Sequence, residues 1–151
     1  MGTDVNLKTV IDGIHAALNI GMTVRVNMVV KKGQNEQDIV PMAKYCKENK
    51  LILRFIEYMD VGNSNGWQWE EVVTKQQILN IVSELRQIET KYPGEVATRY
   101  QYLDNAQELG IISSVTDIFC TTCSRIRISA DGKLYTCLFD QKAMIYAVST
   151  Q

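Results

Sequence analysis

Residues 51–59 read LILRFIEYM, and this apolar stretch decides the fold class of the chain. Its β-branched and aromatic residues and its short length are typical of a buried strand. A second run of the same kind, TVRVNMVV, occupies residues 23–30. Between the two runs, Asp38 is a candidate N-cap that leaves Pro41 in the first turn of a helix extending to about residue 50. Strand, helix and strand in this order predict parallel strands joined by a right-handed crossover.

Helices are also predicted on both sides of this unit. Apolar residues recur at helical spacing from Leu7 to Leu18, and Gly21 is a suitable end for that helix. Thr74 and Gln77 form a capping-box pattern. The apolar positions of the helix that should follow are Ile78, Val82 and Leu85. Two strands are too few for a stable sheet, so this half of the chain is predicted to be part of a larger barrel or open sheet.

The sequence pattern changes near residue 92. Residues 98–104 and 108–115 predict a hairpin around Asn105. Residues 125–129 and 133–138 predict a second hairpin, which turns at residues 130–132 through an Asp-Gly pair, a strong hairpin signal. We therefore expect an α/β portion over residues 4–92 and a hairpin-rich segment over residues 93–151.

The composition is that of an ordinary globular domain. Of the 151 residues, 46% are hydrophobic and 22% are charged, which argues against disorder. The formal net charge of −1 argues against a broad surface for nucleic acid or for an anionic membrane. No apolar run approaches the length of a membrane span and no signal-peptide core is present, so we expect a cytoplasmic location. Thiols stay reduced there, so the 4 cysteines indicate core residues, metal ligands or catalysis rather than disulfides.

Three of the cysteines carry the strongest chemical signal. Cys120, Cys123 and Cys137 follow a C-x2-C-x13-C spacing, and the turn at residues 130–132 should bring the third sulfur back to the first two. Three thiolates suit a structural zinc that finds a fourth ligand, or a four-iron cluster with one iron left open. A set of small buried thiols is the alternative without a metal. Cys46 could be a fourth ligand, but its place in a predicted helix favours core packing.

Charged residues lie next to the cysteines and inside the predicted strands. Arg125 and Arg127 would project from one face of a strand and could grip a phosphate or carboxylate; solvated edge charges are an equal alternative. Arg25 lies in the first strand, and Arg54 and Glu57 lie in the second. Because a buried charge must be paired or bind something, these residues indicate either an internal ion pair or an active-site face.

Met59 ends the second predicted strand, and a polar loop over residues 60–67 follows it. Ligands of α/β folds bind at loops that follow the C-terminal ends of parallel strands. Met59 is therefore a candidate ligand contact, and a core position is the alternative.

Three stretches together resemble one family. They are VRVNMVVKKGQN (residues 24–35), LRFIEYMDVGNSNGW (residues 53–67) and FCTTCSRIRISADGKLYTCLF (residues 119–139). They resemble the MoaA family of radical-SAM enzymes, the GTP 3′,8-cyclases (lyases) of molybdenum cofactor biosynthesis, in the order that the family has them. The resemblance implies an incomplete, TIM-like radical-SAM barrel followed by a small cluster-binding segment that closes its open side.

The resemblance also implies cofactors and site residues. Such enzymes use one iron–sulfur cluster to cleave S-adenosylmethionine and a second [4Fe-4S] cluster to bind GTP. Met59 matches a position that contacts S-adenosylmethionine. The ligands of the second cluster match Cys120, Cys123 and Cys137. The positions that match GTP contacts are Arg25, Arg54, Arg125, Ile126 and Arg127.

Two departures from the family limit what the chain should do alone. The Cys-x3-Cys-x2-Cys motif of the radical-generating cluster is absent from residues 1–151, and residues 140–151 do not continue the family pattern. We therefore expect GTP binding to reside in this chain and radical generation in an N-terminal part of the parent enzyme. The chain alone should be inactive, and it should associate with that part or form a homodimer. A structural zinc-binding module without catalysis is the alternative function.

Overall fold

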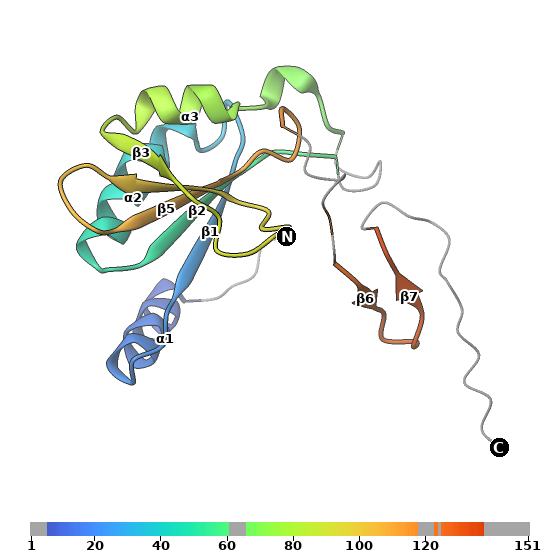
Figure 1. The fold of residues 1–151 in the computed structure, drawn as a ribbon, viewed down its shortest axis with the longest axis horizontal. Coiled ribbons are helices and arrows are strands. Elements are labelled where there is room, and N and C mark those ends of the chain that lie inside the picture. Colours follow the sequence, from blue (N-terminus) through green and yellow to red (C-terminus); the bar gives the residue numbers. More distant parts are fainter. Residues whose placement is uncertain (1–5, 61–65, 118–122, 124, 138–151) are drawn as a thin grey trace.

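The computed structural model describes residues 6–60, 66–117, 123 and 125–137, and a five-stranded sheet dominates it (Figure 1). Across the sheet the strands are β1 (Arg25–Val30), β2 (Ile52–Glu57), β5 (Glu108–Ile112), β4 (Thr98–Tyr102) and β3 (Leu85–Ile88). Strands β1, β2 and β5 run parallel, whereas β4 is antiparallel to β5 and β3 is antiparallel to β4. The sheet is therefore mixed.

Helices connect and cover the strands. Over the described ranges they are α1 (Leu7–Asn19), α2 (Ile39–Glu48) and α3 (Lys75–Ile81), with 3-10 turns η1 (Glu36–Asp38) and η2 (Trp69–Glu71). Helix α2 leads from β1 to the parallel strand β2, so the predicted strand–helix–strand unit is confirmed. The α/β class is confirmed with it, while the radical-SAM barrel stays a prediction.

The two faces of the sheet differ in burial. Along β2 the side chains of Leu53, Phe55 and Glu57 are buried, and the residues between them are partly exposed. Helices α2 and α3 cover the buried face, as shown by a core of Met28, Val30, Ile39, Ala43, Cys46, Leu51, Leu53, Phe55, Val73, Ile78, Val82, Tyr100, Tyr102, Leu109 and Ile111. On the opposite face, Arg25 and Asn27 of β1 are exposed. This open face carries the arginines that the sequence singles out in the two strands.

Helix α1 is attached less firmly than the other two. It lies near the start of β1, away from α2 and α3 (Figure 1), and it has no fully buried residue. Only Ile14 and Leu18 pack against the core, each partly buried. Its predicted span is confirmed, and Gly21 follows it with a left-handed φ of 80°.

One local prediction is wrong, and another, the N-cap at Asp38, is confirmed in position without a capping hydrogen bond. Leu85, predicted as a helical position, begins β3 instead. Helix α3 ends at Ile81, and Glu84 takes a left-handed φ of 68° that redirects the chain into the strand. Asp38 does precede α2, but its side chain makes no capping hydrogen bond. Its backbone is already helical because it belongs to η1, whereas an N-cap side chain needs an extended backbone to reach the first turn.

The predicted hairpins are confirmed. Strand β4 pairs with β5, and β6 (Arg127–Ile128) pairs with β7 (Leu134–Tyr135) in a separate two-stranded sheet. Residue 92 falls between β3 and β4, and these two strands pair with each other, so the main sheet continues across the change in sequence pattern. The division of the chain into residues 4–92 and 93–151 stays a prediction.

Within the described ranges, no helix has both the length and the apolar character that a membrane span requires.

The capping box predicted at α3 is confirmed and supports a stability prediction. Thr74 accepts a hydrogen bond from the Gln77 backbone N–H at 3.3 Å, and Gln77 accepts one from the Thr74 backbone N–H at 2.8 Å. Replacing Thr74 with alanine should lower the free energy of unfolding by about 1 kcal/mol, the usual contribution of an N-cap side chain. Urea unfolding measures this loss. Thr90→Ala, at an exposed position between β3 and β4, is the control, and an equal loss in both variants would contradict the prediction.

Candidate functional site

The C-terminal ends of β1, β2 and β5 lie at the same edge of the sheet because these strands are parallel. Lys31 follows β1, and its ammonium lies 4.6 Å from the centre of the Tyr58 ring, which follows β2. The same ammonium pairs with Glu71 at 3.0 Å. The indole N–H of Trp67 donates to the Tyr58 carbonyl at 3.0 Å, so the end of the predicted loop returns to β2. Loops from different parts of the chain therefore meet at this edge.

Met59 lies at the same edge, directly after Tyr58. Its side chain is half-buried, and it does not belong to the apolar core of the described residues. This position agrees with a ligand contact beyond the end of a parallel strand. The contact itself stays a prediction.

Glu57 at the end of β2 is fully buried, and within the described ranges backbone donors rather than an ion pair hold its carboxylate. Its carboxylate accepts hydrogen bonds from the backbone N–H groups of Lys75, Val115 and Thr116. Periodicity and spacing did not predict this role. The available signal was the position of an acidic residue on the apolar face of a strand, in step with Leu53 and Phe55.

The open face of the sheet brings Arg25 and Arg54 together. Arg54 pairs across the strands with Asn27, two residues after Arg25, and both arginines line one small depression of about 10 Å³. The Arg54 guanidinium lies 4.0 Å from the carboxylate of Glu95, whose side chain is only 4% exposed. Arg54 therefore forms the internal ion pair that the sequence indicated as one alternative. Neither Met59 nor the arginines of the cysteine segment line this depression.

Gly110 of β5 explains how Arg54 can lie flat on the sheet. A Cβ atom at residue 110 would stand 3.1 Å from Cγ of Arg54 and 3.3 Å from Cβ of Ala97. Both distances are shorter than ordinary carbon–carbon contacts. Glycine at this position thus leaves room for the arginine stem to cross the neighbouring strand.

The cysteine segment is described at Cys123 and over residues 125–137, and Cys120 lies outside the described residues. The hairpin turns at Gly132, with a φ of 79°, and the Ser129 N–H donates to the Lys133 carbonyl at 2.9 Å. Arg127 pairs with Tyr135 and Ile128 with Leu134, so β6 and β7 are antiparallel and Cys137 follows the strand that returns beside β6. The predicted hairpin therefore turns the chain back towards the end of the segment at which Cys123 lies, and the joining of the three cysteines in one site stays a prediction.

Arg125 changes the chemistry of Cys123. The guanidinium Nε–H of Arg125 donates to Sγ of Cys123 at 3.4 Å. The pKa of Cys123 is lowered, first by a hydrogen bond from the Arg125 backbone, then by this side-chain bond, with a smaller charge effect from Arg127. A thiolate is the form that binds a metal or cluster. Cys123 therefore fits a ligand role, although the described residues alone contain no group of three potential ligands.

Cys46 has the opposite environment. It is 1% exposed in α2, and its Sγ lies 3.9 Å from Sδ of Met42. Burial raises the pKa of Cys46 to about 11, which keeps it a neutral thiol. The expected core packing of Cys46 is confirmed.

The residues beside Cys123 differ in exposure. Arg125 and Ile126 are exposed, and β6 begins only at Arg127, later than the predicted strand. Arg127 is partly buried, and its Nη1 atom is enclosed without a hydrogen-bond partner in the described part of the chain. An enclosed guanidinium N–H is a donor available to an anion.

The contact between Arg125 and Cys123 leads to a prediction about thiol reactivity. Replacing Arg125 with glutamine should shift the rate of Cys123 alkylation to higher pH, because the thiolate is the reactive form. The backbone N–H at residue 125 remains, so only part of the pKa lowering should be lost. Mass spectrometry of iodoacetamide-labelled peptides from the metal-free chain, at several pH values, measures the rate for each cysteine.

Arg86→Gln is the matched control for this experiment, because that guanidinium binds Gln101 on the main sheet. Cys46 should remain unlabelled in every variant and serves as an internal reference for folding. An unchanged Cys123 profile in the Arg125 variant would refute the influence of the guanidinium.

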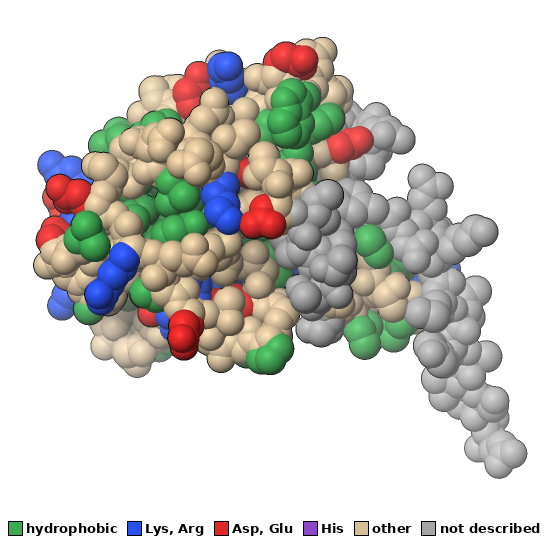
Figure 2. All heavy atoms as spheres, turned by 45° about the horizontal axis from the view of Figure 1, so that its top comes forward, with side chains coloured by type: hydrophobic (Ala, Val, Ile, Leu, Met, Phe, Trp, Pro, Cys, Tyr) green, Lys and Arg blue, Asp and Glu red, His purple; other side chains and the backbone are tan. Residues whose placement is uncertain are grey.

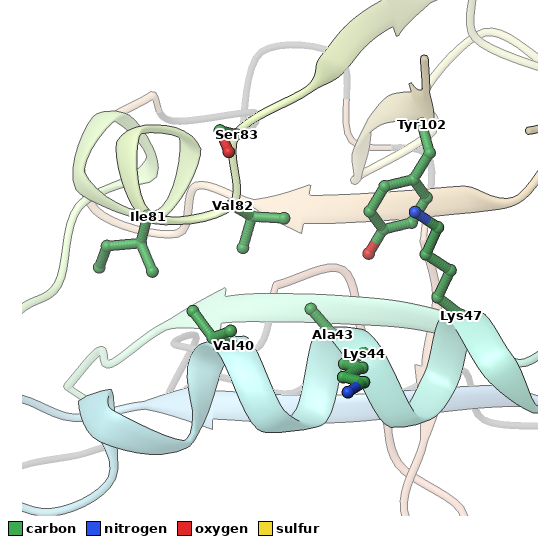
Figure 3. Close-up of a pocket in the computed structure, with 8 residues that line it drawn as sticks. All are labelled: Val40, Ala43, Lys44, Lys47, Ile81, Val82, Ser83 and Tyr102. Carbon is green, nitrogen blue, oxygen red and sulfur yellow. The ribbon is translucent and has the colours of Figure 1, made fainter. Parts of the chain in front are cut away.

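A further depression, of about 210 Å³, lies between α2, the end of α3 and Tyr102 (Figure 3). The ammonium of Lys47 lies 4.5 Å from the centre of the Tyr102 ring and 2.6 Å from the Asp104 carboxylate. Val40, Ala43 and Val82 contribute apolar surface. None of the site residues predicted from the sequence lines it. On the face drawn in Figure 2, basic and acidic side chains are interspersed, without a broad patch of one charge.

Comparison with known proteins identifies the family. The family model described as Molybdenum Cofactor Synthesis C matches residues 51–148. The proteins named GTP 3′,8-cyclase in Staphylococcus carnosus (strain TM300) and Staphylococcus aureus (strain JH9) are each 45% identical to this chain over 139 residues. These alignments cover 90% of this chain and 41% of each relative, so the chain spans about two fifths of the length of these curated relatives. The chain belongs to the Molybdenum Cofactor Synthesis C family.

Proposed function

We propose that this chain is the GTP-binding part of a GTP 3′,8-cyclase of molybdenum cofactor biosynthesis, built on an incomplete radical-SAM barrel. The observation that carries the proposal is the hydrogen bond from Arg125 to Cys123, which places a thiol of lowered pKa and a guanidinium that can bind an anion side by side. The 45% identity to proteins named GTP 3′,8-cyclase supports the same reaction. Radical generation from S-adenosylmethionine belongs to the remainder of the parent enzyme, so the chain alone is inactive.

In this proposal Cys120, Cys123 and Cys137 hold a second [4Fe-4S] cluster. Three thiolates leave one iron without a protein ligand, and that iron would supply a Lewis-acidic position for the guanine base. Arg125 lowers the pKa of Cys123 through its backbone and side-chain hydrogen bonds, which favours the thiolate form that such a cluster requires.

The protein side chains bind and orient the nucleotide. Arg125 and Arg127 flank Ile126, which is 65% exposed, so two cations and an apolar surface lie beside the cysteine. A guanidinium can bind phosphate through two parallel hydrogen bonds, and this geometry fixes the direction of the triphosphate. Arg25 and Arg54 contribute further cationic groups from the open face of the sheet. Met59 contacts S-adenosylmethionine at the C-terminal end of β2.

The proposed barrel requires more strands than the described residues supply. Strand β1 is the outermost strand on one lateral edge of the sheet, and such an edge strand presents backbone groups that can pair with a further strand. The remainder of the parent enzyme is the partner that we propose for this edge, with a homodimer as the other outcome of a size measurement. The proposed location is the cytoplasm, and neither nucleic acid nor membrane is a proposed partner.

Anaerobic reconstitution of the chain with iron and sulfide tests the proposed function. We expect about four iron ions and four sulfides per chain, as in a [4Fe-4S] cluster, with the corresponding visible absorption. GTP should bind to the reconstituted chain more tightly than to the metal-free chain. Tightly bound zinc without stable iron uptake would identify the alternative, a structural zinc module, and would refute the proposal.

Replacing either Arg125 or Arg127 with glutamine should weaken GTP binding by about 1.5–3 kcal/mol, the range for a hydrogen bond to a charged group. Isothermal titration with GTP in the reconstituted chain measures the change. Arg86→Gln on β3 removes the same charge far from the cysteines along the chain, and it should leave the affinity unchanged. Wild-type affinity in either arginine variant would count against the assignment.

A further inference from the structure

Glu57 is a carboxylate buried inside the apolar core. Its side chain is 0% exposed and lies on the helix-covered face of β2. Removing a carboxylate from water costs several kcal/mol unless hydrogen bonds replace the water. A carboxylate at this position therefore needs a specific set of hydrogen-bond donors.

Four donors surround the carboxylate. The backbone N–H of Lys75 donates to Oε1 at 2.8 Å, and the hydroxyl of Thr116 donates to the same oxygen. The backbone N–H groups of Val115 and Thr116 donate to Oε2 at 2.9 and 2.8 Å. Hydrogen bonds to an ionised acceptor are about twice as strong as neutral ones. We call Glu57 and these three donor residues the Glu57 network.

The Glu57 network joins three segments that are distant in sequence. Glu57 ends β2, Lys75 is the first residue of α3, and Val115 and Thr116 belong to the turn that follows β5. An ion pair of 2.9 Å between Lys75 and Asp117 links the same helix and turn on the outside. Because Asp117 is largely exposed, solvent screens that ion pair, and the buried carboxylate is the stronger of the two connections.

The position of the network along the chain connects it to the proposed site. Thr116 precedes Cys120 by four residues, and Glu57 precedes Met59 by two. The residues that Glu57 holds therefore lie between β5 and the cysteines, at the strand end where Met59 lies.

We infer that Glu57 is a positioning residue that anchors the start of the cysteine-bearing segment to the C-terminal end of β2. This inference rests on the proposed function, because it assigns the anchor a role in cluster binding. Glu57 touches neither cluster nor nucleotide in this role. It acts through Val115 and Thr116, whose backbone it holds at the start of the segment that leads to the cysteines.

Glu57→Gln is the most direct test, because it keeps the side-chain shape. In the glutamine variant an NH₂ group would replace one carboxylate oxygen and would face N–H groups that donate hydrogen bonds to that oxygen in the wild type. Two donors cannot bond to each other, so part of the network must break. In the metal-free chain, hydrogen exchange at Val115 and Thr116 should accelerate by roughly tenfold or more, the least that losing a hydrogen bond to a charged group implies. In the reconstituted chain, loss of iron to a chelator should accelerate by a similar factor.

Two further variants separate positioning from stability. Thr116→Val removes only the hydroxyl donor and should show a smaller effect in the same direction, which keeps the test valid if Glu57→Gln folds poorly. Phe55→Leu lies two residues earlier on the same face and weakens the core without removing an acceptor. Phe55→Leu should lose iron at close to the wild-type rate when it is compared with Glu57→Gln and the wild type under conditions that give the same folded fraction.

Three results would overturn the inference. Wild-type iron loss in Glu57→Gln, despite faster exchange at Val115 and Thr116, would show that the anchor does not affect the site. Equal acceleration of iron loss in Phe55→Leu would show that the effect of Glu57→Gln comes from lower stability and not from positioning. Failure of the wild-type chain to take up a cluster would refute the proposed function and the role that rests on it, and hydrogen exchange would still report whether Glu57 holds the turn.

Discussion

Replacing Cys123 with alanine should abolish binding of the [4Fe-4S] cluster by the reconstituted chain. Only two cysteine ligands of the C-x2-C-x13-C set would remain, and the thiolate favoured by Arg125 would be lost. Such clusters depend on deprotonated cysteine ligands. Iron and sulfide analysis, together with the visible spectrum, measures the loss. GTP affinity should fall to that of the metal-free chain.

Cys46→Ala is the matched control for the loss of one thiol. Cys46 is buried in α2, and burial raises its pKa to about 11, so it should not contribute a ligand. This variant should keep its iron, sulfide and visible absorption. Retention of a full cluster by Cys123→Ala, or its loss in Cys46→Ala, would show that the ligand set has been assigned wrongly.

Replacing Phe55 with alanine should lower the free energy of unfolding by about 3–5 kcal/mol, the range for truncating a buried aromatic residue. Phe55 is 0% exposed at the centre of β2, with β1 on one side and β5 on the other. Few neighbours can fill the space, since the core is close-packed. Denaturant unfolding followed by circular dichroism measures the change, which is a large share of the stability of an ordinary domain.

Val29→Ala is the control on the neighbouring strand. Val29 is 48% exposed and belongs to the open face of β1, so its truncation removes little buried surface. We expect a loss of less than about 1 kcal/mol, since surface substitutions have small effects. A comparable loss in the two variants would mean that the open face is covered in solution, or that Phe55 contributes less than its burial indicates.

Local patterns predicted the elements that depend on local chemistry. The capping box at Thr74 and Gln77 depends on residues three apart, and the turn at Gly132 depends on one residue that tolerates a positive φ. The helix at Leu85 failed for a related reason. The apolar spacing there continues a helix, but Glu84 adopts a left-handed conformation because β3 pairs with β4, a contact that the spacing does not encode.

Only part of the candidate site could be predicted from the sequence. The cysteine spacing and the neighbouring arginines are sequence features, and the contact between Arg125 and Cys123 agrees with them. The sequence also indicated that Arg54 could be paired, but Glu95 as the partner depends on how the β3–β4 loop folds over the open face of the sheet. Distance along the chain carries no information about such a contact.

The amino-acid sequence by itself determined the α/β class, the parallel pair β1 and β2 and both hairpins, because these follow from periodicity and turn chemistry within short windows. The cysteine spacing is read directly from the sequence. Tertiary structure alone decided that β4 and β3 extend the same sheet beyond β5, and that Glu57 binds the turn after β5. A buried carboxylate must find donors wherever the packed chain supplies them, and here they come from residues 18 and 58–59 positions away. The sequence showed that Glu57 needed partners, and only the folded chain showed which ones it has.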